Sequence, residues 1–133
     1  MFGAYAIIAY VLLYTHLSGV FAADCDALQG LPLSGDPSSG IAWCCNQSRV
    51  VCRQQHSNPA PIVTHVDLSS LSLISLPPVF FTLSRLVYLD VSGNALESLL
   101  NFSQLRALQF LNCSENNNVN GDPELAIWGP FFI

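Results

Sequence analysis

Lysine is absent from the 133-residue sequence, and charged residues of any kind make up only 10% of it. Nine acidic residues outnumber four arginines, which gives a net charge of −5. Proteins that bind nucleic acid or an anionic membrane surface need clustered Lys and Arg to meet the phosphates. The composition therefore argues against both partners, and the length accommodates one domain and not two.

Catalytic signatures are missing as well. The sequence contains no GxSxG, P-loop or HExxH motif. A nucleophile with its base needs a placed histidine, but His16 lies in an apolar N-terminal stretch and His56 in a Pro/Asn-rich loop. His65 falls on an outward strand position. We expect a protein without enzyme activity, cofactor or metal.

The N-terminus has the layout of a secretory signal peptide. No charge occurs over residues 2–23, and residues 7–13 are apolar throughout. Val20 and Ala22 suit the −3 and −1 positions of a cleavage site. The sequence therefore predicts a signal peptide at 1–22 and a protein that is secreted or lies at the cell surface. An uncleaved membrane anchor is the alternative, because the stretch approaches spanning length and its first residues lack Lys and Arg.

Four of the five cysteines follow closely: Cys25, Cys44, Cys45 and Cys52. In an oxidising compartment such a set forms disulfides. A bridge between the adjacent Cys44 and Cys45 would strain the backbone, so two pairings remain. We favour Cys25–Cys44 with Cys45–Cys52, which makes one long loop and one tight one, and the second pairing stays open. A zinc site is a weaker alternative, since paired CxxC spacing is absent.

An internal repeat begins after residue 62. The segments 63–73, 86–96 and 108–118 each follow apolar-x-x-apolar-x-apolar, and the second carries the full LxxLxLxxNxL signature. They start 23 and 22 residues apart, within the roughly 20–29 residues of leucine-rich repeats. The pattern predicts an α/β solenoid: a leucine-rich-repeat arc with short parallel strands on its concave face and a disulfide-bonded N-terminal cap.

Each copy should contribute one short strand whose side chains alternate between core and solvent. The residues expected in the core are Val66, Leu68, Leu89, Val91, Leu111 and Cys113. Asn94 and Asn116 should hydrogen-bond backbone groups of adjacent turns. Phe80, Phe81 or both should pack between copies. Cys113 is then a small buried hydrophobe, with an intermolecular disulfide as the alternative.

The chain resembles the N-terminal part of an extracellular leucine-rich-repeat protein, as found in plant receptor-like proteins, receptor kinases and polygalacturonase inhibitors. Besides the repeat, the segment WCCNQSRVVC at 43–52 is similar to the Trp…Cys-Cys…Val-x-Cys cap of that family, and Cys25 completes its four-cysteine pattern. The resemblance covers about residues 24–125. It implies bridges from first to second and from third to fourth cysteine, and recognition of an extracellular protein, peptide or glycan in cell-surface signalling or defence.

The expected organisation is a signal peptide at 1–22, a cysteine-rich N-terminal cap at 23–61, about three leucine-rich repeats at 62–125, and a tail at 126–133. The tail lacks a polar cap for the last repeat, which favours a truncated chain. Membrane attachment would then come only through a missing C-terminal part. Two other functions stay open: a secreted inhibitor of a foreign hydrolase, and a non-functional fragment of a longer receptor.

Three sequons predict N-glycosylation, at Asn46, Asn101 and Asn112, with Asn101 the favoured site.

The outward strand positions predict where a partner binds. They form a column of His65, Tyr88 and Phe110, and beside it a column that includes Asp67 and Asp90. The family resemblance accounts for the aspartates structurally. Nothing in the fold requires aromatic rings on the solvent side, and exposed rings are enriched in binding hot spots. We therefore expect the aromatic column to bind the partner.

Overall fold

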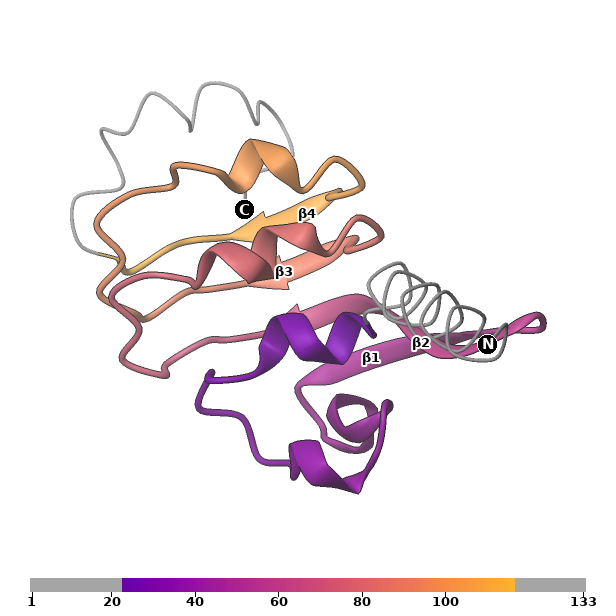
Figure 1. Ribbon diagram of the computed structural model, residues 1–133. Helices are drawn as coiled ribbons and strands as arrows, with labels where there is room; N and C mark the ends of the chain where they lie inside the picture. Colours follow the sequence, from indigo (N-terminus) through magenta and orange to yellow (C-terminus); the bar gives the residue numbers. More distant parts are fainter. Residues whose placement is uncertain (1–22, 117–133) are drawn as a thin grey trace, which may run out of the picture.

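The computed structural model describes residues 23–116, and the predicted signal peptide and C-terminal tail lie outside this range (Figure 1). Four strands form one sheet in the order β1-β2-β3-β4: Val50–Gln55, Asn58–Asp67, Tyr88–Asp90 and Phe110–Asn112. The helical elements in the described range are short 3₁₀ helices: η1 (Asp24–Leu28), η2 (Pro37–Ser39), η3 (Trp43–Asn46), η4 (Pro78–Thr82) and η5 (Phe102–Gln104).

The predicted fold class, an α/β solenoid in the form of a leucine-rich-repeat arc, is wrong. Residues 23–116 contain no α-helix, and their sheet is small and mixed, because β1 and β2 pair antiparallel while β2, β3 and β4 pair parallel. The segment before β3 contains Pro77 and Pro78, and its helix η4 has only five residues. Proline fits the first position of a helix but lacks the amide donor of an interior residue, so Pro77 and Pro78 allow η4 to begin there and prevent it from extending towards the N-terminus. A curved arc needs many stacked units, and this chain has only two parallel strand pairings in the described range.

The strand register agrees with the repeat spacing. His65 pairs with Tyr88 and Tyr88 with Phe110, so β2, β3 and β4 are offset by the two repeat lengths. The six residues expected in the core are all buried, at 5% exposure or less: Val66, Leu68, Leu89, Val91, Leu111 and Cys113. The predicted alternation of buried and exposed side chains in these strands is therefore confirmed.

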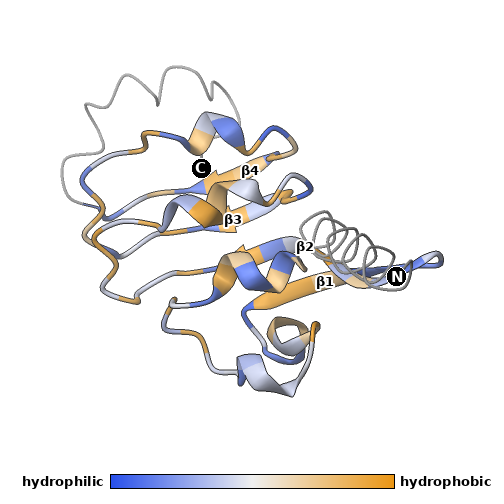
Figure 2. Ribbon diagram, in the orientation of Figure 1, coloured by the Kyte–Doolittle hydropathy of each residue, from blue (hydrophilic) through white to orange (hydrophobic). Residues whose placement is uncertain are grey.

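Three of the helices lie over one face of the sheet, and within residues 23–116 no helix lies over the other face, which we call the open face (Figure 1). Helix η1 packs on β2 and η4, and η4 packs on η5, so the three lie side by side over the same face (Figure 1). Phe80 and Phe81 are both buried, and Phe81 meets Phe102 of η5 edge-on at 5.4 Å between ring centroids. Their predicted packing between successive turns is confirmed. The tip of the β1–β2 hairpin consists of hydrophilic residues (Figure 2).

Two disulfides tie the N-terminal helices to the sheet. Cys25–Cys44 joins η1 to η3, and Cys45–Cys52 joins η3 to β1. The favoured pairing is therefore confirmed. The adjacent Cys44 and Cys45 lie in the 3₁₀ helix η3. Consecutive side chains of such a helix point about 120° apart, which directs the two sulfurs to different partners.

Asn94 is the one buried polar residue of the described chain, and its side chain links two turns. Its Oδ1 accepts from the backbone amides of Leu71 and Leu73, each at 3.0 Å. Its Nδ2 donates at 2.8 Å to the carbonyls of Leu68 and Val91. The side chain thereby satisfies backbone groups that leave the strands and have no ladder partner.

Asn116 repeats this arrangement one turn later. Its Oδ1 accepts from the amide of Leu96 at 3.0 Å, and its Nδ2 donates to the carbonyl of Val91 at 2.9 Å. The predicted role of both asparagines is confirmed.

We predict that Asn94→Ala lowers the free energy of unfolding by about 3 kcal/mol, because it leaves several backbone groups without partners at roughly 1–3 kcal/mol each. Urea unfolding should give a lower midpoint with an unchanged slope. The control is Gln109→Ala, which truncates an exposed side chain and should stay within about 0.5 kcal/mol of wild type. Equal midpoints for the two variants would contradict the assigned role of Asn94.

Candidate binding face

The open face of the sheet carries the three aromatic residues in a row. His65, Tyr88 and Phe110 occupy the same register on β2, β3 and β4. The His65 and Tyr88 rings lie 5.6 Å apart with 20° between planes, and the Tyr88 and Phe110 rings lie 4.4 Å apart with 4° between planes. The column predicted from the sequence is therefore present, and its rings are stacked. We call these three residues the aromatic row.

Val51 extends the aromatic row by one strand. It pairs with His65 across the β1–β2 hairpin, so both side chains point to the same face, and Val51 is 52% exposed. Val51 was not predicted from the sequence, because it lies in the expected cysteine-rich cap, where no strand was assigned. The only local signal was a short run of β-branched residues before Cys52.

The stacking decides which part of each ring a partner meets. Tyr88 lies between two stacked rings: Phe110 is nearly parallel to it and covers one face, and His65, inclined by 20° at a longer centroid distance, covers part of the other. A ring edge is the positive part of the aromatic quadrupole, whereas cations bind the face. The open edges of the row therefore suit carbonyl and carboxylate oxygens and apolar groups better than cations.

Asp67 and Asp90, in the neighbouring column, stabilise the turns that follow their strands. In each case Oδ1 accepts from the amide and the hydroxyl of the serine two residues later, at 2.6–2.9 Å. Asn112 makes the same two contacts with Ser114. One carboxylate oxygen of each aspartate is therefore used in the hydrogen bonds that stabilise the turn after the strand. The second oxygen of Asp90 accepts from Asn112 Nδ2 at 3.3 Å.

Asp67 also forms an ion pair with Arg49, at 3.4 Å between Nη1 and Oδ1. Partial burial raises the pKa of Asp67, but the bonds from Ser69 and the charge of Arg49 outweigh it, so the pKa lies below its ordinary value. Burial, and then the charges of Asp90 and Asp67, raise the pKa of Tyr88. The face therefore presents a protonated phenol beside an ionised carboxylate at neutral pH.

Two arginines lie on the other side of the aromatic row. A shallow cavity of about 270 Å³ is lined by Arg53 and Arg85 together with the residues that directly precede the three members of the row in the sequence: Thr64, Val87 and Gln109. Along the direction of β2, β3 and β4, the arginines therefore precede the aromatic row and the aspartates follow it. Neither arginine was predicted from the sequence, because Arg53 lies in the expected N-terminal cap and Arg85 lies outside the repeat motif.

The three sequons differ in their surroundings. Asn46 ends η3 and is exposed, Asn101 is exposed beside η5, and Asn112 is half-buried in the sheet face next to the aromatic row. Glycosylation at each stays a prediction.

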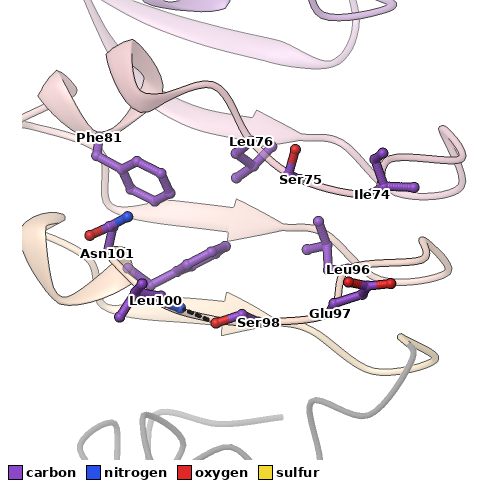
Figure 3. Close-up of a pocket in the computed structure, with 10 residues that line it drawn as sticks. Ile74, Ser75, Leu76, Phe81, Leu96, Glu97, Ser98, Leu100 and Asn101 are labelled. Atoms are coloured by element: carbon purple, nitrogen blue, oxygen red, sulfur yellow. Dashed lines mark hydrogen bonds between the residues drawn. The ribbon is translucent and has the colours of Figure 1, made fainter.

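A second hollow lies between two successive turns of the chain, away from the aromatic row, and has a volume of about 270 Å³. Two of its lining residues, Ile74 and Leu100, are 72% and 63% exposed. We call it the outer groove. Figure 3 shows Asn101 and Phe81 near one end of it and Ile74 and Glu97 near the other.

The clustered sulfurs of Cys25, Cys44 and Cys45 cannot bind a metal ion as thiolates. They lie within 4.8 Å of one another, but all three belong to disulfides and offer no thiolate. The disulfides indicate an oxidising environment such as the outside of the cell. Within residues 23–116, no helix has the length and apolar character needed to cross a membrane.

Comparison with protein-family models, curated proteins and solved structures finds no match for this chain. The resemblance to extracellular leucine-rich-repeat proteins accordingly stays a prediction from the sequence motifs.

Cys113 is a free thiol in the core, 5% exposed. Burial raises its pKa to about 11, and a backbone hydrogen bond lowers it by less. A buried thiol that stays protonated is a poor nucleophile. The expectation that Cys113 behaves as a small buried hydrophobe is confirmed.

We predict that Cys113 of the folded chain reacts with iodoacetamide slowly at pH 8, because its thiolate fraction is roughly 100-fold below that of a thiol with the ordinary pKa. Since the pKa is higher in the folded state, stability should be unaffected below about pH 9 and should fall as the pH rises towards 11. Mass spectrometry of native and urea-unfolded protein gives the two alkylation rates. Equal rates, or a disulfide at Cys113, would contradict the core assignment.

Proposed function

We propose that this chain is an extracellular binding module that acts in recognition at the cell surface and binds a segment of another protein through its open sheet face. The observation that carries the proposal is the aromatic row, whose rings are stacked and yet left at the surface. His65 is exposed, and Tyr88 and Phe110 are each half-buried. Side chains held in one arrangement before binding lose little conformational freedom when a partner arrives.

The charges around the aromatic row favour a partner whose acidic and basic side chains lie on opposite sides of an apolar one. Arg53 and Arg85 flank one side of the row, and Asp67 and Asp90 flank the other. A complementary peptide places an acidic side chain over the arginines, an apolar side chain on the ring edges, and a basic side chain over the aspartates. A sugar ring, which would stack on an aromatic face, finds one face of Tyr88 covered and the other partly covered by its neighbours.

The proposal can be tested with random peptides displayed on phage and selected on the full secreted chain. We predict that the selected peptides bind the Tyr88→Ala/Phe110→Ala variant about 30-fold more weakly than wild type. This corresponds to a loss of roughly 2 kcal/mol, as expected for two central aromatic contacts. Isothermal titration calorimetry gives both dissociation constants. The sequences should carry acidic and basic residues on opposite sides of an apolar residue.

The matched control is Ile74→Ala/Leu100→Ala, which removes exposed apolar side chains from the outer groove instead. It should leave the affinity of the selected peptides unchanged. Peptides that bind the aromatic variant as tightly as wild type, while that variant unfolds at the wild-type midpoint, would overturn the proposed site.

A further inference from the structure

We propose that Asn101 carries an N-linked glycan whose first sugar residues lie in the outer groove. The inference rests on the proposed function only in requiring that the chain passes through the secretory pathway. The outer groove is separate from the aromatic row, and the sugar residues would cover its apolar side chains.

The outer groove has the size and lining of a shallow sugar site. At about 270 Å³, it falls below the usual range of pockets for drug-sized ligands. Its lining combines the apolar side chains of Leu76, Phe81 and Leu100 with the polar ones of Glu97 and Ser98. An N-acetylglucosamine residue likewise has an apolar ring face and methyl group beside several hydroxyls. Covering the groove would remove two of the most exposed large apolar side chains of the described chain from water.

Asn101 is itself part of the groove lining, so a sugar on it begins at the groove (Figure 3). The residue is exposed, and its backbone is left-handed with φ 77°. Its Oδ1 accepts a hydrogen bond from Gln104 Nε2 at 3.0 Å. A sugar bonded to Nδ2 leaves that bond intact.

The left-handed backbone accounts for an asparagine at this position, because Asn tolerates positive φ better than most residues. It does not account for Ser103, the exposed hydroxyl residue that completes the sequon. Asn112 is a poorer acceptor, since it is half-buried and its Nδ2 donates to Asp90. Asn46 is exposed but does not line the outer groove.

The modification is a substitution at the first carbon of an oligosaccharide carried on a lipid pyrophosphate. The Asn101 amide nitrogen forms a bond to that carbon while the bond from carbon to pyrophosphate oxygen breaks. The pyrophosphate leaves with the electron pair, and the amide gives up one proton to a base of the transferring enzyme. No oxidant or reductant is needed.

The test compares Ser103→Ala, which destroys the sequon without changing Asn101, with Ser103→Thr, which keeps it. The full chain is produced in a secretory host that glycosylates asparagine and is mapped by mass spectrometry after treatment with a peptide N-glycosidase. The glycosidase converts a glycosylated asparagine to aspartate. Wild type and Ser103→Thr should show aspartate at position 101, and Ser103→Ala should show asparagine.

Two further readouts report on the groove. Loss of the glycan in Ser103→Ala should lower Tm by about 4 °C and raise the fluorescence of a dye that binds exposed apolar surface. Adding Ile74→Ser/Leu100→Ser to Ser103→Ala should abolish the rise in fluorescence. Ser48→Ala, which removes the Asn46 sequon, should leave the fluorescence unchanged.

A secreted chain with unmodified Asn101 would overturn this inference alone. A chain that stays in the cytosol with reduced cysteines would overturn the proposed function as well. Glycosylation at Asn101 with identical Tm and dye fluorescence for Ser103→Ala and Ser103→Thr would overturn the placement of the sugar in the outer groove.

Discussion

The hydrogen bonds of Asn94 hold the stacked strands in the register on which the open face depends. A single side chain accepts from two amides of the turn after β2 and donates to carbonyls that follow β2 and β3. These groups lie where the chain leaves the sheet, so the strands themselves supply no partner. Asn116 repeats the arrangement one turn later and reaches back to Val91. The two asparagine side chains thereby fix the spacing between successive turns.

The register in turn determines the surface. Because β2, β3 and β4 pair without a shift, one outward position on each strand falls in a straight line, and rings at that position stack. The aspartates two residues later repeat in the same way, since each turns the chain by bonding the serine that follows it. The disulfides link η1 to η3 and η3 to β1. The positions of the side chains on the open face are therefore determined by the register of the strands and the packing of the core.

The sequence predicted the parts of this structure that repeat. A spacing of 22 and 23 residues is enough to place the inward side chains, the asparagines and the aromatic row, because each recurs at a fixed position. It did not predict β1 or the arginines, which occur once and outside the motif. The solenoid class was wrong because the spacing specifies how strands stack and does not specify the connections between them. Here those connections contain short 3₁₀ helices, one of which begins at the second of two consecutive prolines.

The central claim is that the core packing holds Tyr88 and Phe110 as stacked rings on an exposed face. Proton nuclear Overhauser spectroscopy of the full chain in solution tests it most directly. The account predicts cross-peaks between the Tyr88 and Phe110 ring protons, and upfield shifts of those protons from the neighbouring ring at 4.4 Å. Ring resonances at unfolded-chain positions without such cross-peaks, in a protein whose Leu89 and Leu111 side chains show core contacts, would contradict it.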